Sequence, residues 1–268
     1  MKENFIGVGL RPTHFPYLKK RPQTHIDWFE VITENIMNSF GRPYEMVKMI
    51  REDYPIALHG VSLSIASHEQ VNLKYLENLK RLCQEFDPIR VTDHLCWTGL
   101  KEHNFHNLLP FPYTDETLDH IAKKVDTVQT KLKRQIGLEN LSAYFSLKNS
   151  KYSEHHFIKK LIEKTGCQIL LDINNIYVNS VNQDFNPKEY LDTFQKEDIA
   201  QIHLAGHSDF GDYLFDTHSG EVCEDVWDLF KYKKSDLKEV PILIEWDQDI
   251  PEFPKVEQEA IKAREILK

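Results

Sequence analysis

Paired cysteines are missing from this sequence of 268 residues. The four cysteines, Cys83, Cys96, Cys167 and Cys223, are widely spaced and form no Cys-x-x-Cys pair. This spacing argues against a disulfide framework and against a zinc or iron–sulfur site made of thiolates. We therefore expect the cysteines to be reduced.

Long apolar runs and an excess of positive charge are also lacking. No run of about 18 apolar residues occurs, and residues 1–5 show no basic region followed by an apolar one. We therefore expect neither a membrane span nor a signal peptide, and we place the protein in the cytoplasm. The formal net charge is −9 and no long Lys/Arg stripe is present, which argues against a nucleic-acid partner.

Short runs of Val, Ile and Leu alternate with longer stretches of helical periodicity, as in βα units around a parallel sheet. We predict one domain, residues 1–268, folded as an α/β protein of the (β/α)8 barrel type. The predicted strands are Phe5–Leu10, Asp27–Ile32, Pro55–Leu58, Ile89–Thr92, Gln135–Leu138, Gln168–Leu171, Ala200–Leu204 and Pro241–Ile244. The predicted helices are Pro43–Asp53, Val71–Phe86, Asp115–Lys133, Ser153–Thr165, Pro187–Gln195, Glu224–Lys231 and Lys255–Leu267.

Two connections and two helix ends are specific enough to predict. Thr114 is a plausible N-cap before Asp115, and Gly166 is a C-terminal stop. The Ser/Asn-rich stretch Ser142–Ser153 is typical of a βα loop. Trp97–Tyr113 is the longest irregular stretch, and we predict that it forms part of the substrate pocket.

Residues that can bind metal gather at the carboxyl ends of the predicted strands, where barrel enzymes build their sites. Strands three to eight end in, or contain near their ends, His59, Asp93-His94, Glu139-Asn140, Asp172, His203 and Glu245. One such residue is more often a structural group than a ligand. Six strands carrying them in register indicate metal, because crowded carboxylates repel one another unless a cation lies between them.

A further pair, Asp216 and His218, lies in the loop after strand seven, in the motif DTHSG. In an extended segment the side chains at positions i and i+2 point the same way, so both can bind one ion. The alternative is that the pair lies in a solvated turn. Eight side chains exceed the three or four that one catalytic ion uses, so we predict two or three ions. Imidazole and carboxylate without thiolate suit iron, manganese or zinc.

At these residues the chain resembles the multinuclear non-heme iron-dependent oxidative enzymes, barrels related to xylose isomerases and to the oxidase of methanobactin maturation. The resemblance spans nearly the whole chain. It rests on the motifs GVGLRPTH, FEVITEN, LHGVSLSIAS, TDHLCW, LLPFPYT, GLENLSAY, LLDINNIYVN, IHLAGH, DTHSG and LIEWD.

The resemblance implies a ligand set of His59, His94, Glu139, Asp172, His203, Asp216, His218 and Glu245, with Asn174 as a possible further ligand. It implies two or three iron ions in a mixed Fe(II)/Fe(III) state, O2 as co-substrate, and a metal-bound oxygen species rather than a protein nucleophile as the catalyst. The implied substrate is a cysteine residue of a ribosomally made precursor peptide (a RiPP), with a small peptide-recognition partner protein.

Other polar residues near the strand ends have supporting roles in this hypothesis. Asp93, Asn140 and Asn175 are expected to orient ligands, and His207 either to do so or to make a structural hydrogen bond. Arg11 and His14 could bind the peptide, although a salt bridge from Arg11 to Glu30 or Glu34 is an equal alternative. Glu34 and Asn35, from FEVITEN, are included as candidates for contact with ligands or substrate.

Two other functions fit the same residues. One is a redox-neutral metalloenzyme, either a sugar isomerase or a zinc phosphodiesterase like endonuclease IV. The acidic charge weakens the phosphodiesterase, and the lack of an evident lysine at a strand end weakens the isomerase. The other is a metal-loaded scaffold without catalysis, although open polynuclear sites are typical of enzymes.

Overall fold

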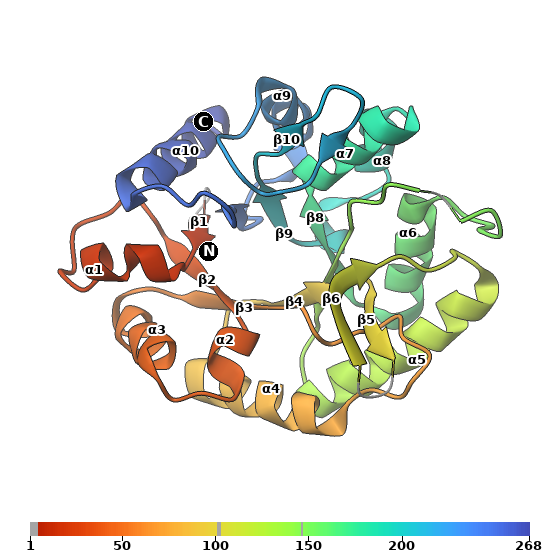
Figure 1. Cartoon of the computed structure of the whole chain (residues 1–268), viewed down its shortest axis with the longest axis horizontal. Coiled ribbons are helices and arrows are strands. Elements are labelled where there is room, and N and C mark those ends of the chain that lie inside the picture. The colour runs from red at the N-terminus through yellow and green to blue at the C-terminus, as the bar shows by residue number, and fades with distance from the viewer. Residues whose placement is uncertain (1–4, 101–102, 146) are drawn as a thin grey trace.

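The barrel strands carry the residues that position the site. A computed structural model describes residues 5–100, 103–145 and 147–268; residues 101–102 of the predicted Trp97–Tyr113 stretch and residue 146 of the predicted loop lie outside this range. Eight parallel strands close into a barrel in the order β1-β12-β9-β8-β7-β4-β3-β2, with helices around it (Figure 1). The strands are β1 Ile6–Gly9, β2 Trp28–Ile32, β3 Ile56–Gly60, β4 Val91–His94, β7 Gly137–Glu139, β8 Gln168–Asp172, β9 Ile199–Leu204 and β12 Ile242–Ile244.

All eight predicted strands are confirmed, with small differences at their ends. Strands β3 and β4 each extend two residues further than predicted, so that His59 and His94 lie within strands rather than after them. The register pairs His94 with Glu139 and Asp172 with His203 on neighbouring strands. Residues paired in this way project to the same side of a sheet, which brings imidazole and carboxylate groups together inside the barrel.

Ten α-helices lie among the described residues, and all seven predicted helices are present. They are α1 Phe15–Leu18, α2 Glu34–Met37, α3 Arg42–Asp53, α4 Leu73–Phe86, α5 Asp115–Leu132, α6 Glu154–Thr165, α7 Ile173–Gln183, α8 Pro187–Asp192, α9 Glu224–Lys233 and α10 Phe253–Ile266. Thr114 caps α5 by accepting a hydrogen bond from the backbone N–H of Thr117, and Gly166 ends α6 with φ +67°. Both predicted helix ends are confirmed.

One helix next to the site was not predicted. Helix α7 begins directly after Asp172, whose side chain caps it by accepting a hydrogen bond from the backbone N–H of Asn175. Its sequence, INNIYVNSVNQ, is rich in Asn and β-branched residues, which are weak helix formers in isolation. Packing of its apolar face, including Ile173 and Ile176, overrides that weak local preference.

The stretch predicted to be irregular contains a β-hairpin. Strand β5 Trp97–Leu100 pairs antiparallel with β6 His103–Leu109, and a smaller hairpin, β10 Ser208–Asp209 with β11 Leu214–Phe215, follows β9. Much of the β5–β6 hairpin is exposed, so it lacks the apolar alternation by which strands are recognised. Both hairpins lie at the end of the barrel where the site is built (Figure 1).

The opposite end of the barrel is closed by packing. Phe5, Trp28, Ala57 and Leu243 form a buried cluster inside the barrel. A side chain at Gly7 would collide with the Trp28 ring, so glycine is what allows the indole to fill the interior. No helix in the described part of the chain is long and apolar enough to cross a membrane.

Candidate metal centre

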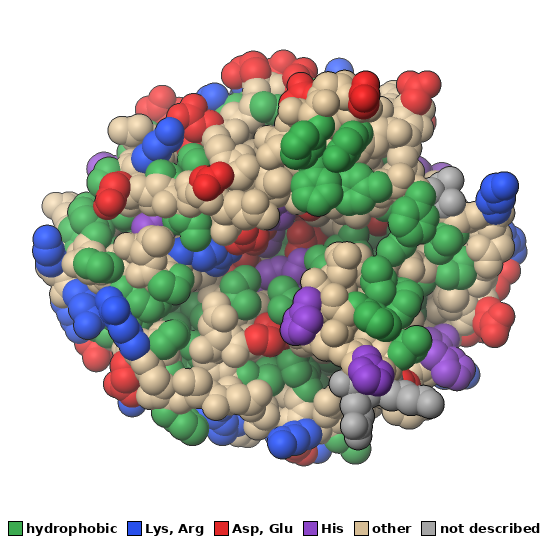
Figure 2. All heavy atoms as spheres, in the orientation of Figure 1, with side chains coloured by type: hydrophobic (Ala, Val, Ile, Leu, Met, Phe, Trp, Pro, Cys, Tyr) green, Lys and Arg blue, Asp and Glu red, His purple; other side chains and the backbone are tan. Residues whose placement is uncertain are grey.

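A cavity of about 520 Å³ opens at the carboxyl ends of the barrel strands. Figure 2 shows the molecule hollowed here, with histidine and acidic side chains on the floor of the hollow. The volume lies in the usual range for small-molecule and cofactor sites. The lining includes His59, His94, Glu139, Asn175, Asp216, His218 and Glu245.

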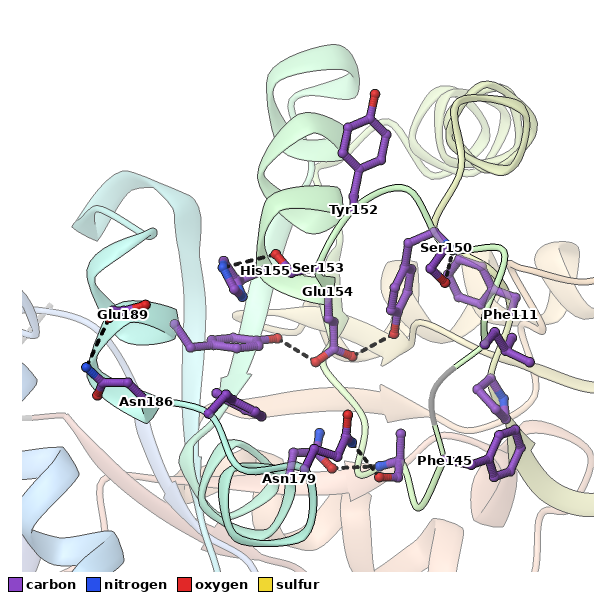
Figure 3. A pocket seen from close by; sticks show the side chains of 17 residues that line it. Phe111, Phe145, Ser150, Tyr152, Ser153, Glu154, His155, Asn179, Asn186 and Glu189 are labelled. Carbon is purple, nitrogen blue, oxygen red and sulfur yellow. Dashed lines mark hydrogen bonds between the residues drawn. The ribbon is translucent and has the colours of Figure 1, made fainter.

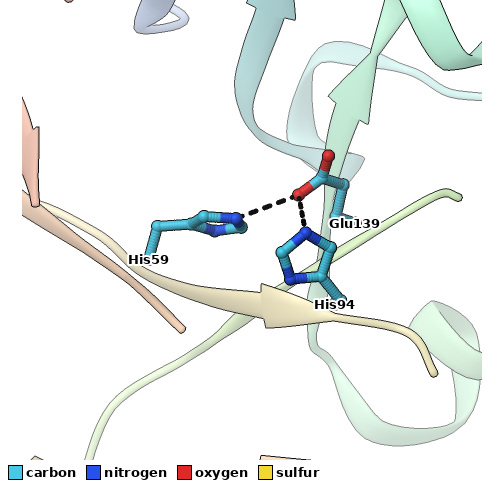
Figure 4. A group of neighbouring side chains, drawn as sticks. All are labelled: His59, His94 and Glu139. Carbon is cyan, nitrogen blue, oxygen red and sulfur yellow. Dashed lines mark ion pairs between the residues drawn. The ribbon is translucent and has the colours of Figure 1, made fainter. Parts of the chain in front are cut away.

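The first group of potential ligands consists of His59, His94 and Glu139 (Figure 4). The Nε2 atoms of His59 and His94 lie 3.2 Å and 3.3 Å from the same Glu139 oxygen, Oε2. The Nδ1 atom of His94 donates to the Gly60 carbonyl oxygen at 2.9 Å, and Nδ1 of His59 shares a hydrogen bond with the Thr92 hydroxyl. Because a carbonyl only accepts, the Nε2 of a neutral His94 presents a lone pair toward the carboxylate, and a cation is needed between them.

The second group lies deeper and combines Glu139, Asp172, His203 and Glu245, all of them buried. The Nδ1 atom of His203 lies 2.7 Å from Glu245 Oε2, 3.9 Å from Glu139 Oε1 and 4.0 Å from Asp172 Oδ2. Three carboxylates therefore surround one imidazole nitrogen. Glu139 belongs to both the first and the second group, so it can bridge two ions.

The third group consists of His218, Glu245 and Asp247. The Nδ1 atom of His218 lies 3.1 Å from Glu245 Oε2 and 3.5 Å from Asp247 Oδ2. Its Nε2 lies 2.8 Å from Asp216 Oδ1 and 3.6 Å from Asp172 Oδ2. Glu245 thus joins the second group to the third, as Glu139 joins the first to the second.

Asp216 and Asn174 lie beside the third group. Asn174 donates to Asp216 Oδ1 at 3.1 Å, and the Ser142 hydroxyl donates to Asp216 Oδ2 at 2.9 Å. His207 bonds through Nδ1 to the Asn174 side-chain oxygen at 2.8 Å. The predicted pair Asp216 and His218 therefore meets, but His218 has a left-handed backbone conformation, with φ +44°, rather than an extended one.

The donor atoms fit metal ions. Within the described part of the chain, Glu139 Oε2, Asp172 Oδ2, His203 Nδ1, His218 Nε2 and Glu245 Oε2 are buried and make no hydrogen bond. These atoms face one another across the groups. Buried polar atoms nearly always have partners, and acceptors that converge without a donor are the surroundings that a cation satisfies.

The acidic and imidazole groups of the cluster shift one another's pKa values. Burial opposes ionisation of Glu139, but the imidazoles of His94, His59 and His203 outweigh it and lower its pKa to about 2. Burial raises the pKa of Asp172 well above its usual value, and the neighbouring charges of Glu139 and Asp216 add to this. Glu139 is thus held ionised, whereas Asp172 resists ionisation because of the negative charges around it. Divalent cations would relieve the repulsion among these carboxylates.

Asn140, Asn175 and Asp93, which were predicted to orient ligands, make hydrogen bonds to candidate ligands and to the backbone beside them. The Asn140 side chain donates to the Asp172 carbonyl and accepts from its backbone N–H, at 3.0 Å and 2.9 Å. Asn175 donates from its backbone N–H to Asp172 Oδ1 and from its side chain to the Asn140 carbonyl. Asp93 accepts from the backbone N–H groups of His94 and Leu63, fixing the end of β4.

Arg11 and Glu34 are two further candidates for contact with ligands or substrate. Arg11 bonds to Asp247 Oδ1 from Nη2 at 2.5 Å and lies 3.4 Å from Glu245 Oε1, so its ion pairs are not with Glu30 or Glu34. Glu34 accepts from the backbone N–H groups that follow β3, at 3.1 Å and 2.9 Å, and from the Tyr75 hydroxyl. All three hydrogen bonds reach Glu34 Oε1, whereas Oε2 is buried and makes no hydrogen bond within the described residues.

His14 and Asn35 lie outside the lining of the mouth cavity. His14 is buried, bonds to the Pro251 carbonyl oxygen at 3.0 Å and packs edge-on against Phe253. Asn35 is exposed on α2. Proximity in sequence to strand ends did not bring these two residues to the site.

Three residues near the cluster were not among the predicted site residues: Glu30, Gln201 and Asp247. Glu30 is fully buried, and its Oε1 lies 3.2 Å from His203 Nε2; Gln201 donates to the same carboxylate. A charged residue within the apolar strand WFEVI was an available signal for Glu30. Asp247 lies in the third group, and only its position two residues past Glu245 marked it.

Comparison with known proteins adds relatives of similar length. The chain is 44% identical over 246 residues to a UPF0276 protein of Caulobacter vibrioides, covering 92% of this chain and 88% of the relative. It is 40% identical over 261 residues to a UPF0276 protein of Acaryochloris marina, covering 97% of this chain and 94% of the relative.

Solved structures share the fold at low sequence identity. A 3-keto-D-glucoside 4-epimerase from E. coli matches with TM-score 0.64 and 15% identity, covering 97% of this chain and 99% of that one. Endonuclease IV from Thermus thermophilus matches with TM-score 0.62 and 13% identity, covering 98% of each chain. A fusion protein described as a xylose isomerase-like TIM barrel also matches, with TM-score 0.60, 12% identity and coverage of 99% of this chain and 42% of that one. The predicted barrel of xylose-isomerase type is therefore confirmed.

A protein-family model decides among the enzymes that share this barrel. The model for the RiPP precursor modification enzymes MbnB/TglH/ChrH matches residues 5–268. That range includes every strand end that contributes to the three groups. The chain therefore belongs to the MbnB/TglH/ChrH family of RiPP precursor modification enzymes.

Proposed function

We propose that this enzyme binds two or three iron ions at the barrel mouth and uses O2 to oxidise a cysteine residue of a precursor peptide. The ligands in this proposal are His59, His94, Glu139, Asp172, His203, Asp216, His218 and Glu245, with Asn174 beside them. A small partner protein that recognises the peptide belongs to the same proposal, as does a mixed Fe(II)/Fe(III) state.

The observation that carries the proposal is the sharing of carboxylates between groups. Glu139 serves the first and second groups, and Glu245 serves the second and third. Four imidazoles and the carboxylates between them match the ligand preferences of non-heme iron, which takes nitrogen and oxygen donors and leaves positions open. Carboxylates shared between neighbouring groups of ligands would suit a multinuclear catalytic site.

Iron held there would supply the redox chemistry, taking electrons from the cysteine and passing them to O2. The electron balance follows from the substrate. Each pair of hydrogen atoms removed from the cysteine and its adjoining peptide reduces half of an O2 molecule to one water. Removal of four hydrogen atoms, as closure of an unsaturated heterocycle requires, therefore consumes one O2 and releases two waters.

The chain's own residues hold the ligands and enclose the substrate. Hydrogen bonds to Gly60 and Thr92 turn the Nε2 atoms of His94 and His59 toward Glu139. The β5–β6 hairpin contributes Thr98, Asn104, His106, Asn107 and Leu108 to the cavity wall. A wall of this kind limits access of water and holds a peptide segment over the cluster.

A redox-neutral reaction is the competing proposal, because sugar epimerases and endonuclease IV share this fold. Among the described residues that line the mouth cavity there is no lysine or arginine. Lysine and arginine side chains favour the binding of a phosphodiester. Their absence from the described lining and the net charge of −9 therefore disfavour a nuclease. The metal and the oxygen requirement separate oxidation from both alternatives.

The test begins with protein purified without oxygen and with metal analysis. We expect bound iron, and we expect a cysteine-bearing precursor peptide encoded beside the gene to change mass only when iron and O2 are present. A mild one-electron reductant such as ascorbate should sustain turnover by keeping part of the iron as Fe(II), because the proposed active state holds both Fe(II) and Fe(III). Equal conversion with zinc in the absence of O2 would rule out the oxidase.

The matched variants for this test are His59→Ala and His25→Ala. His59 is buried in the first group, whereas His25 is exposed and does not line the mouth cavity. We expect His59→Ala to lose iron and conversion while the circular dichroism spectrum stays unchanged, since residues at a barrel mouth serve function more than stability. His25→Ala should behave as the unmodified protein does.

A further inference from the structure

A second cavity, of about 350 Å³, lies between the β7–α6 connection, helix α6 and the segment around α8 (Figure 3). Phe111, Tyr113, Phe145, Leu147, Phe185 and Tyr190 provide most of its apolar wall. The volume is within the range of ligand pockets. None of the predicted metal ligands lies in this wall.

The charges around the cavity restrict what it can bind. The described lining includes the carboxyl groups of Glu154 and Glu189 but no lysine or arginine. An anionic ligand would therefore be buried beside carboxyl groups without a compensating cation. An uncharged apolar group is favoured, because burying it against aromatic rings costs no desolvation of a charge.

The polar groups in the wall are already engaged. Glu154 accepts from the Tyr113 and Tyr190 hydroxyls at 3.0 Å and 2.9 Å (Figure 3). Asn179 accepts from the backbone N–H of Ala143 and donates to the Leu141 carbonyl, both at 2.7 Å. The wall is thus fixed without a ligand, and these hydrogen bonds leave shape and apolar contact as the means of recognition.

One short segment separates this cavity from the mouth. Ser142 and Tyr144 line the mouth cavity, whereas Ala143 and Phe145 line the second one. The two faces of this segment therefore serve different cavities, as alternation along extended backbone allows. The Ser142 hydroxyl also donates to Asp216 Oδ2, so the segment that separates the two cavities contacts a candidate metal ligand.

Exposed aromatic rings connect the two openings over the surface. Phe145 is 58% exposed, Tyr144 44% and Phe215 38%, and the rings of Tyr144 and Phe215 stack with centroids 5.1 Å apart. In Figure 2 hydrophobic side chains gather beside the hollow of the barrel mouth. Exposed aromatic groups next to a pocket are typical of surfaces that bind a polypeptide.

We propose that the second cavity binds a bulky apolar side chain of the same precursor peptide whose cysteine enters the barrel mouth. The identity of the ligand as a peptide rests on the proposed function. A chain that crosses Tyr144 would place one residue in each cavity, so that apolar anchoring fixes which cysteine lies over the metal centre. The second cavity is then a specificity site, separate from the chemistry.

The first experiment asks whether the cavity accepts an apolar amino-acid side chain. The probe is N-acetyl-L-phenylalaninamide, and the measurement is the methyl NMR shift of Ala143 and Leu147 in the full chain. We expect a saturable shift with this probe and none with the α-amide of N-acetyl-L-aspartate. If the phenylalanine probe moves neither methyl signal, the proposal is overturned.

Substitutions of exposed aromatic residues test the cavity without removing a buried side chain from the core. Phe145→Asp changes a ring that is 58% exposed, and Phe40→Asp is the matched control at a ring that is 69% exposed and lines neither cavity. We expect Phe145→Asp to weaken probe binding about tenfold, from the loss of apolar contact and the added charge, with no effect of Phe40→Asp. Equal weakening by both variants contradicts a local site.

The second experiment uses the precursor peptide and metal-loaded enzyme. We expect Phe145→Asp to raise KM for cysteine modification about tenfold with little change in kcat, and replacement of one apolar peptide residue by Asp to do the same to the unmodified enzyme. If the probe binds but neither change affects KM, the assignment to the peptide is wrong. Probe binding without any cysteine oxidation would instead refute the proposed function and leave the apolar site standing.

Discussion

Glu30 shows how one buried side chain can set the direction of a ligand. Its carboxylate lies 3.2 Å from His203 Nε2, and both side chains are fully buried. With Nε2 engaged there, the Nδ1 atom of His203 is left to face Glu245 and the neighbouring carboxylates. A carboxylate behind a histidine fixes its tautomer and strengthens it as a metal ligand.

We therefore expect Glu30→Gln to lower the affinity for the metal in the second group by about 10- to 100-fold, the usual effect of losing such a partner. The measurement is an anaerobic Fe(II) titration followed by metal analysis. Glu34→Gln is the control, because the Glu34 carboxylate faces the backbone N–H groups after β3 and not the cluster. Unchanged affinity in Glu30→Gln would show that Gln201 alone orients His203.

The sequence indicated most of the cluster but not these supporting residues. His59, His94, Glu139, Asp172, His203 and Glu245 could be found because the carboxyl ends of barrel strands converge. Glu30 lies in the middle of β2, and Asp247 lies beyond β12, so a search of strand ends passes over both. The ion pairs of Arg11 depend on its distances to several acidic side chains in the folded protein. Sequence spacing does not give those distances.

At the scale of elements, the loop with Asp216 and His218 is anchored more firmly than an extended polar loop would be. Asp216 accepts hydrogen bonds from Ser142 and Asn174, and its backbone N–H donates to the Tyr144 hydroxyl at 3.0 Å. A bridge between Ser219 and Gln248 ties the following turn to the segment after β12. The loop still has to be ordered by these contacts, whereas the strand-borne ligands are held by the barrel.

The double variant Asp216→Ala, His218→Ala should lose about one ion and peptide oxidation while keeping the other ions, because ligands held by a loop bind most weakly. Anomalous diffraction from crystals of the variant measures which positions are occupied. Asp212→Ala, in the exposed turn between β10 and β11, is the control. A full set of metal peaks in the double variant would reassign the loop as an ordinary turn.

Helix α7 marks the limit of local patterns at this scale. Its Asn residues lower helix propensity, yet Asn174 and Asn175 reach Asp216 and Asn140 only because the helix begins at Asp172. The strands were predictable from short continuous apolar runs, because both of their faces are buried, and the amphipathic helices from burial with a period of 3.6 residues. A helix that buries several amides follows neither pattern.

Glu154 at the start of α6 gives a prediction about pH. Burial raises its pKa to about 7, against the hydrogen bonds from Tyr190 and Tyr113 that lower it. The folded protein therefore holds a proton that the unfolded chain releases near pH 4.5. The stability that this proton supplies is complete below the unfolded pKa and is lost as the pH rises through about 7.

We expect the Glu154→Gln variant, whose amide has no proton to lose in this range, to lack this pH-dependent part of the unfolding free energy. Between pH 5 and pH 8 the unfolding free energy of the unmodified protein should fall by about 2 kcal/mol relative to the variant. Urea unfolding with a chelator present measures it without a contribution from metal. A difference between the two proteins that stays constant with pH would contradict the raised pKa.

At the scale of the whole molecule, folding and function lie at opposite ends of the barrel. Phe5, Trp28, Ala57 and Leu243 fill the closed end, and the large core between the strands and helices is apolar. The open end concentrates acids whose repulsion the apolar packing must overcome. The sequence shows this division directly, since charged residues gather at one end of the apolar runs.

Removal of metal should therefore destabilise the protein without unfolding it. Ions that bind only the folded chain stabilise it by about 2.7 kcal/mol at a concentration of 100 times Kd, and relief of repulsion among Asp172, Glu139 and Glu245 is part of that binding energy. For a chain of this length, that corresponds to a fall in Tm of about 5–10 °C.

Thermal unfolding before chelation, after chelation and after readdition of Fe(II) without oxygen measures the effect. The circular dichroism spectrum at 25 °C should stay the same, because the packing of the apolar core, rather than the metal, holds the strands and helices together. His59→Ala combined with Glu139→Ala removes two of the three residues of the first group, including the carboxylate that it shares with the second, and should show a much smaller response to Fe(II). If chelation left the Tm of the unmodified protein unchanged, the convergent acids would have to be satisfied by protons, and the raised pKa of Asp172 would then be the reason that the cluster tolerates its own charge.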